Sequence, residues 1–185
     1  TAAETAFRRH VRGSIVLPAL RFARLPSTSP AHAARGLEAK LAAMKAAGFS
    51  QVMLKANDIN GHPGGIEAAV AAVKASGLRG TGFQVLRDFE GLSGHLHHYK
   101  VDIAKAMLAM AHAVGAPLLL ACSSTSQHAT QDLDAIARDL RKLAMLAVPL
   151  GLKVAYEGLS WGRTVNEYTT AWDVVCRADC PNLGL

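Results

Sequence analysis

Apolar residues along this chain form two kinds of segment that alternate. Short, nearly continuous apolar runs predict strands, and they cover residues 14–18, 51–55, 81–86, 117–122, 152–156 and 183–185. Longer segments, in which apolar residues recur every three or four positions, predict helices over 36–47, 66–76, 94–115 and 132–150. A last helical pattern is carried by Val165, Tyr168, Trp172 and Val175, spaced by 3, 4 and 3 residues. The chain is therefore predicted to repeat a strand-helix unit.

The polar segments between these units are predicted to be loops, and one helix carries a clear apolar stripe. Residues 20–34 contain two prolines, residues 57–65 are polar and rich in glycine, and residues 123–130 are small and polar, so each is expected to be a loop. In the long helix, the 4, 4, 3 and 4 spacing predicts one core-facing stripe: Tyr99, Ile103, Met107, Met110 and Val114.

Strict alternation of strand and helix implies a parallel sheet with right-handed crossovers. The 185 residues suffice for one sizeable domain, here with five strand-helix units and the opening of a sixth strand. A TIM barrel needs eight units and about 250 residues, whereas an open doubly wound sheet needs five or six. The pattern alone leaves both open. The first strand is not followed by a Gly-x-Gly-x-x-Gly turn and the chain has no Walker lysine motif, so a nucleotide-binding version is disfavoured.

The composition of the chain limits the classes of partner that it is expected to bind. The net charge is +6, but no run of Lys and Arg exceeds two, so we expect a solvated basic surface and no nucleic-acid binding. A mildly positive site would suit an anionic substrate. No apolar run approaches the roughly 20 residues of a membrane span, so no membrane association is expected. Three cysteines in no framework spacing favour free thiols and a cytoplasmic location.

The candidate chemistry lies where the predicted strands end, because the carboxyl ends of parallel strands face one side. This places an acid, an arginine and several amides together, which suits a hard divalent cation and an oxygen-rich anionic substrate. Alternatives remain: Glu157 could be a surface carboxylate, and Arg87 could pair with Asp88 and Glu90. The strand-end residues are Asn57, Asp58, 84–88, Ser123, Ser124 and 157–166.

His95, His97 and His98 could suggest a metal site, since they fall within four residues. On a helix, however, only His95 and His98 share a face. A solvated helix start is therefore favoured over a set of metal ligands.

Several blocks of this sequence stand out: Tyr-Glu-Gly-Leu-Ser-Trp-Gly-Arg at 156–163, Asn166, Ala-Trp at 171–172, the tail at 177–185, and Phe-Gln-Val-Leu-Arg-Asp-Phe-Glu-Gly at 83–91. Together they resemble bacterial 3-dehydroshikimate dehydratases, members of the sugar phosphate isomerase/epimerase superfamily of metal-dependent TIM barrels. The likeness runs from about Ser14 to Leu185. It implies an α/β fold comprising the first five and a half units of a TIM (β/α)8 barrel, with a domain at 14–185 and an N-terminal tail at 1–13.

The resemblance also implies an activity. Similar enzymes dehydrate 3-dehydroshikimate to protocatechuate, in the catabolism of quinate and shikimate, with a divalent cation such as Mg²⁺, Mn²⁺ or Co²⁺. Glu157 matches the first metal ligand of the family, and Arg87, Gln84, Asn166 and Ser123 are the expected contacts to a small anionic hydroxy-keto acid. A homo-oligomer is compatible with this reading.

The departures from the family matter as well. The family's second metal ligand and its catalytic histidine are expected beyond Leu185, so no catalytic base is assigned and the 185-residue chain is expected to be inactive alone. Thr164 stands where the family often has histidine, and Met53 and Ala56 stand where it often has acids. Two other functions therefore stay open: a sugar or cyclitol isomerase, epimerase or dehydratase of the same superfamily, and a non-enzymatic binding module with an open sheet edge.

Overall fold

The computed structural model describes residues 2–11 and 35–185. The strand expected at 14–18 and the loop expected at 20–34 lie outside the described residues. Within the range expected to be a tail, residues Ala2–His10 form the helix α1.

A single parallel sheet forms the centre of the chain. It contains five strands: β1 (Gln51–Lys55), β2 (Arg79–Arg87), β3 (Leu118–Cys122), β4 (Lys153–Glu157) and β5 (Leu183–Gly184). Their spatial order is β1-β2-β3-β4-β5, and every neighbouring pair is parallel. A doubly wound sheet reverses its strand order at a switch point. Here the order never reverses, so the fold is a partial α/β barrel.

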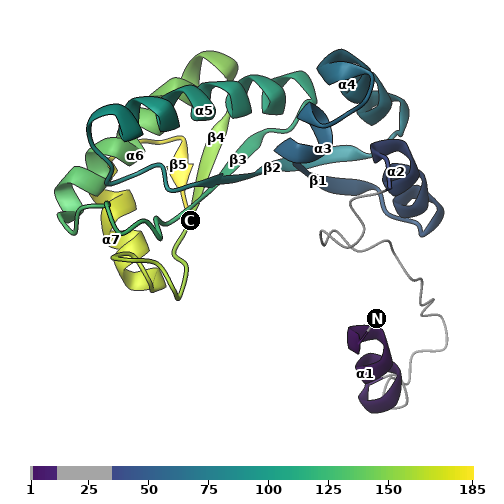
Figure 1. Ribbon diagram of the computed structural model, residues 1–185, viewed down its shortest axis with the longest axis horizontal. Coiled ribbons are helices and arrows are strands. Elements are labelled where there is room, and N and C mark those ends of the chain that lie inside the picture. Colours follow the sequence, from purple (N-terminus) through teal and green to yellow (C-terminus); the bar gives the residue numbers. More distant parts are fainter. Residues whose placement is uncertain (1, 12–34) are drawn as a thin grey trace.

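The strands are connected by helices that cover the outer side of the curved sheet, where α4 and α5 are seen most clearly (Figure 1). None of the described helices is long and apolar enough to cross a membrane. The helices are α2 (Leu37–Ala46), α3 (Ala56–Asn60), α4 (Gly65–Ala75), α5 (Gly94–Ala113), α6 (Leu133–Ala147) followed by a 3-10 turn (Val148–Leu150), and α7 (Tyr168–Ala178).

Alternation along the strands separates the two faces of the sheet. In β4, Val154 and Tyr156 are buried under the helices, whereas Lys153 and Glu157 are exposed on the other face. Successive side chains of a strand point to opposite faces, so one face forms the core with the helices. The other face carries the polar strand-end residues.

The segment at 57–65 was expected to be a loop, and this prediction is wrong at its start. Residues Ala56–Asn60 form the short helix α3. Ile59 within it is fully buried, and Asp58 receives a 2.6 Å ion pair from Lys40. Burial of one isoleucine in a polar segment outweighs the local turn signals.

The stripe predicted for the long helix is rotated. Tyr99 is 61% exposed, and Ile103 and Met110 are only partly buried. Small residues occupy part of the core-facing side, which consists of Val101, Ala104, Met107, Leu108 and Ala111. Alanines let the helix approach the sheet closely, and a pattern read from the large residues overlooks them.

The last helix differs in the same way. It begins at Tyr168, and Val165 is buried in the preceding loop. Tyr168 and Trp172 are 78% and 57% exposed rather than inward. The buried side consists of Ala171, Val174, Val175 and Ala178.

Candidate functional site

Arg87, Cys122 and Glu157 form one row across the ends of three strands. Arg87 pairs in register with Cys122, and Cys122 pairs with Glu157. They are the last residues of β2, β3 and β4. The preceding row, Leu86, Ala121 and Tyr156, is buried toward the helices. The next row must therefore face the opposite side, the inside of the barrel arc. This confirms that Arg87 and Glu157 lie at the same end of a parallel sheet.

A bulge in β2 decides which way Arg87 faces. Between Phe83 and Leu86, two residues of β2 lie opposite one residue of β3, because Phe83 pairs with Leu119 and Leu86 with Ala121. Phe83 and Leu86 are both buried toward the helices although they are three residues apart. Simple alternation from Phe83 would put Arg87 on the helix side, and the extra residue turns it to the inner face.

Glu157 has a thiol as its neighbour. Cys122 Sγ donates a hydrogen bond of 3.3 Å to Glu157 Oε2. Burial, together with this bond and the negative charge of Glu157, raises the pKa of Cys122 to about 12. The thiol is therefore a neutral donor to the carboxylate and no nucleophile at neutral pH. All three cysteines are free, as expected.

Arg87 does not pair with the acids that follow it. In the described part of the chain its guanidinium makes no ion pair, and its carbonyl oxygen accepts a hydrogen bond of 2.8 Å from Lys100 Nζ. The proposed salt bridge with Asp88 and Glu90 is not formed. The exposed cation is thus left available at the end of the sheet.

Asp88 instead fixes the loop after β3. Its Oδ1 accepts hydrogen bonds from Thr125 N at 2.8 Å, Thr125 Oγ1 at 3.2 Å and Ser124 Oγ at 3.3 Å. The residue adopts φ +52°, a left-handed conformation that suits Asp better than most non-glycine residues. Partial burial acts to raise the pKa of Asp88, but the hydrogen bonds from Thr125 and Ser124 and the charge of Lys100 outweigh it and leave the pKa lowered.

Glu90, in the loop after β2, is buried between the ends of β3 and β4, with 2% of its surface exposed. Its Oε1 accepts hydrogen bonds from Ser124 N and, at 3.0 Å, from Tyr156 Oη. Burial raises the pKa of Glu90 to about 7, against the effect of these bonds. Burial and the proximity of Glu90 raise the pKa of Tyr156 as well. The sequence reading considered Glu90 only as a partner of Arg87; its position between Phe89 and Leu92, both buried, was the available signal.

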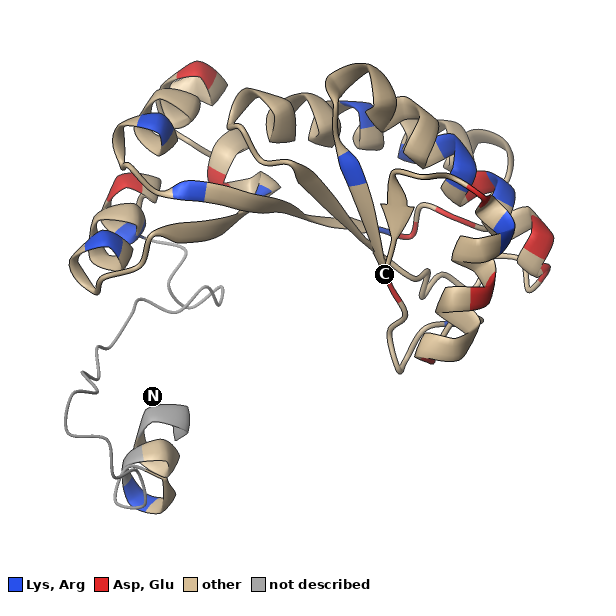
Figure 2. Cartoon of the chain, turned by 180° about the vertical axis from the view of Figure 1, so that it is seen from behind, with Lys and Arg blue, Asp and Glu red and all other residues tan. Residues whose placement is uncertain are grey.

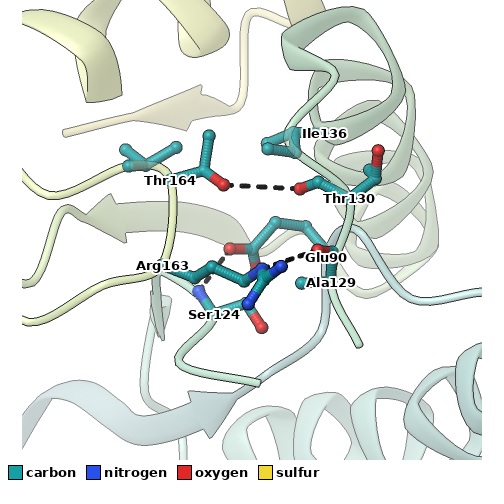
Figure 3. A pocket seen from close by; sticks show the side chains of 8 residues that line it. Glu90, Ser124, Ala129, Thr130, Ile136, Arg163 and Thr164 are labelled. Carbon is teal, nitrogen blue, oxygen red and sulfur yellow. Dashed lines mark hydrogen bonds between the residues drawn. The ribbon is translucent and has the colours of Figure 1, made fainter. Parts of the chain in front are cut away.

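The loop after β4 is tied to the loop after β3 (Figure 3). Arg163 N donates to Ser124 O at 2.8 Å, and Arg163 Nε donates to Ala129 O at 3.0 Å. Thr164 Oγ1 donates to Thr130 O at 3.4 Å. These contacts line a narrow cleft next to Glu90. The side chains of Arg163 and Thr164 therefore bind backbone carbonyl groups of the neighbouring loop.

The three other predicted substrate contacts differ in burial and in position. Ser123 is 2% exposed; its Oγ accepts from Leu159 N at 2.8 Å and its N donates to Glu157 O at 2.8 Å. Gln84 is half-buried, pairs in register with Lys55 and lines a cavity of about 200 Å³ between β1 and α2. Asn166 is exposed on the loop after β4. Their contacts to a substrate stay predictions.

A complete metal site is not formed by the described residues. No group of three or more His, Cys, Asp or Glu side chains lies close enough within them to hold a metal ion. Mg²⁺ takes about six oxygen ligands, and one carboxylate supplies at most two. The described residues therefore do not by themselves fit a divalent cation, and Glu157 as one ligand stays a prediction.

The histidines at the start of α5 do not form a ligand set. His95 and His98 are exposed, as expected for a solvated helix start. His97 is half-buried, with its ring 5.8 Å from that of Phe89 and its Nε2 3.1 Å from Lys142 Nζ. The basic residues of the described chain are spread over several helices and strands (Figure 2).

Comparison with known proteins defines the class. A family model described as xylose isomerase-like TIM barrel matches residues 41–185, and the chain belongs to this family. The parallel strands in sequential order and the polar row at their carboxyl ends agree with that membership.

Within the family, the chain is similar to 3-dehydroshikimate dehydratases. It is 38% identical to that of Pseudomonas aeruginosa and 36% identical to that of Pseudomonas putida, over 80% of this chain in both cases. It is 27% identical to that of Neurospora crassa over 65% of this chain. The chain spans 24% of the length of the two bacterial relatives.

Solved structures give the same picture. A xylose isomerase-like TIM barrel/4-hydroxyphenylpyruvate dioxygenase fusion protein superposes with a TM-score of 0.75 and 35% identity, over 81% of this chain and 24% of that one. A D-psicose 3-epimerase from Clostridium cellulolyticum superposes with a TM-score of 0.63 over 79% of this chain and 55% of that one. At 14% identity, the latter shows the fold alone.

Proposed function

We propose that this chain carries part of the active site of a hydro-lyase that dehydrates 3-dehydroshikimate to protocatechuate. The observation that carries the proposal is the row Arg87–Cys122–Glu157, which sets a free cation and a carboxylate on one face at the ends of neighbouring strands. The two bacterial relatives named 3-dehydroshikimate dehydratase support the choice of substrate.

Arg87 is assigned to the negative group of the substrate. Its guanidinium is exposed and not engaged by the acids beside it, so its donors are available to a carboxylate or a charged oxygen. A planar guanidinium donates two parallel hydrogen bonds to a carboxylate, which fixes orientation as well as charge. Gln84, Asn166 and Ser123 are the other proposed contacts. The bond from Leu159 N uses one lone pair of the Ser123 hydroxyl oxygen and leaves its proton and its second lone pair for a substrate.

Glu157 is assigned as one ligand of a divalent cation, Mg²⁺, Mn²⁺ or Co²⁺. The exposed carboxylate stands at the strand end and is oriented by the Cys122 thiol. A hard cation prefers such an oxygen ligand. We assign no further metal ligand and no base for the substrate proton among the described residues, which hold no group of three or more potential ligands.

The test is an assay of the whole gene product for protocatechuate, whose aromatic ring absorbs in the near ultraviolet. 3-Dehydroshikimate is supplied with Mg²⁺, Mn²⁺ or Co²⁺, and keto-sugars are supplied in parallel. Protocatechuate formed only in the presence of a cation supports the proposal. Isomerised or epimerised sugars without protocatechuate would assign the chain to the sugar-converting members of the superfamily. Turnover of neither substrate would favour the third hypothesis, a non-enzymatic binding module.

A further inference from the structure

We infer that Glu90 is a positioning residue for this site, an inference that rests on the proposed function. Its buried carboxyl group joins the ends of β2, β3 and β4 and thereby aligns Glu157 with Arg87. Glu90 lies behind the site on the helix side of the sheet and is not itself assigned any contact to substrate.

The first support is that one oxygen of Glu90 bridges two strands. Oε1 accepts from Ser124 N, just after β3, and from Tyr156 Oη, in β4. Glu90 itself belongs to the loop after β2, so three successive units meet at one atom. Because only 2% of the Glu90 surface is exposed, water does not compete for these hydrogen bonds.

The second support is the short path from Glu90 to Glu157. Tyr156 immediately precedes Glu157 in β4, and its hydroxyl holds the strand end against Glu90. Ser124 immediately follows Ser123, whose N donates to Glu157 O at 2.8 Å. The backbone of Glu157 is thus held on both sides by groups that Glu90 fixes.

The third support is the path to the loop after β4. Ser124 N donates to Glu90 Oε1 (Figure 3). Ser124 O, in the next peptide group, accepts from Arg163 N at 2.8 Å. Removing the carboxyl group would therefore loosen the loop that holds Asn166 as well as the strand end. Asp88 contacts the loop after β3 but not β4, so only Glu90 of the two acids links all three units.

The fourth support is the cost of placing this group here. Glu90 Oε2 is buried and has no hydrogen-bond partner. A buried polar atom without a partner destabilises a fold, and an apolar side chain would avoid that cost. Holding the strand ends in one arrangement is a role that an apolar side chain could not take.

The variants separate positioning from general stability. Glu90→Gln keeps a carbonyl oxygen that can accept from Ser124 N and Tyr156 Oη, whereas Glu90→Leu has similar size and no acceptor. Tyr156→Phe removes one donor only and serves where Glu90→Leu does not fold. Glu67→Gln, on the exposed side of α4, is the matched control for loss of a carboxylate.

Steady-state kinetics of the whole gene product provide the first readout. Glu90→Leu is expected to lower kcat by about 10- to 100-fold, because small misplacements of catalytic groups are costly. KM is expected to rise by a smaller factor than kcat falls, because Glu90 does not itself touch the substrate and acts on its contacts only through the backbone. Glu90→Gln should recover most of kcat, and Glu67→Gln should match the wild type. A Glu90→Leu protein that folds and keeps the wild-type kcat would overturn the inference, as would a Glu90→Gln protein as impaired as Glu90→Leu.

Hydrogen exchange provides a readout that does not depend on the substrate. The amides of Ser123 and Leu159 donate to Glu157 O and Ser123 Oγ. They should exchange at least about tenfold faster in Glu90→Leu or Tyr156→Phe, while core amides of β3 keep their protection. If the wild type makes no protocatechuate, the proposed function fails, and this measurement still decides the positioning role: unchanged exchange at both amides would reject it.

Discussion

Cys122 donates a hydrogen bond of 3.3 Å to the carboxylate of Glu157, across the register pair that joins the ends of β3 and β4. Burial and this bond raise the pKa of the thiol to about 12. At pH 8 the thiolate should be present in only about one molecule in ten thousand, and the thiolate is the reactive form.

Cys122 should therefore resist alkylation under native conditions. Iodoacetamide at pH 8, followed by peptide mass spectrometry, should label the exposed Cys176 at least about a hundredfold faster than Cys122. Unfolding in denaturant serves as the control and should make the two rates equal. Comparable labelling of both cysteines in the native protein would contradict the arrangement of Cys122 and Glu157.

Arg87 should determine substrate affinity. Replacing Arg87 with alanine removes a charge-assisted donor worth about 1.5–3 kcal/mol, or roughly a ten- to hundredfold rise in KM. Arg87→Lys keeps the charge but not the paired donors, so its KM should lie between those of the wild type and Arg87→Ala. Arg138→Ala, on the exposed side of α6, is a control for the loss of one positive charge. An unchanged KM in Arg87→Ala would remove Arg87 from the binding site.

Glu90 should make stability fall as the pH rises toward neutrality. Its pKa is raised to about 7 in the folded chain, by burial and by the charge of Asp88, from an ordinary value of 4.5. Between these values the folded chain binds more protons than the unfolded chain, so the free energy of unfolding decreases with pH. The contribution is fully present below about pH 4.5 and is lost as the pH passes 7; it is on the order of 3 kcal/mol.

Denaturant unfolding at pH 5, 6 and 7 of the wild type and Glu90→Gln measures this contribution. The glutamine stays neutral, so the difference between the two proteins isolates Glu90 from histidines that titrate in the same range. The wild type should lose stability relative to Glu90→Gln as the pH rises. Parallel curves would show that Glu90 does not hold its proton in the folded chain.

Gly162 should tolerate no side chain. A Cβ at this position would lie 2.5 Å from Val165 O and 2.6 Å from Ser123 Oγ, and the first of these is backbone. Gly162→Ala should therefore cost about 1–3 kcal/mol of stability through overpacking. Gly184→Ala is the matched control, because nothing lies within 4 Å of its Cβ position. Thermal unfolding of the two variants makes the comparison, and equal midpoints would contradict it.

The strands and most helices were predictable because their signals are local. The apolar runs at 51–55, 117–122 and 152–156 are apolar enough to be predicted as strands without a structure. The core-facing sides of α5 and α7 were not predictable from large residues alone, since alanines occupy them.

The site was predictable only in part. The strand-end position of Glu157 and Arg87 follows from parallel topology, but the inward direction of Arg87 depends on the bulge between Phe83 and Leu86. A bulge is a property of strand pairing and leaves no fixed pattern in one sequence. The role of Glu90 depends on Ser124 and Tyr156, which lie 34 and 66 residues away along the chain.

The most direct test of the central claim, that Glu157 serves a cation-dependent dehydration, is protocatechuate formation from 3-dehydroshikimate by the whole gene product and two of its variants. Glu157→Gln removes the proposed ligand's charge, and Glu167→Gln removes a carboxylate from the exposed start of α7. We predict that the wild type and Glu167→Gln turn over with Mn²⁺ and stop with a chelator, while Glu157→Gln loses at least about a hundredfold in kcat/KM, equivalent to about 2.7 kcal/mol. Equal turnover by Glu157→Gln and the wild type would contradict the account.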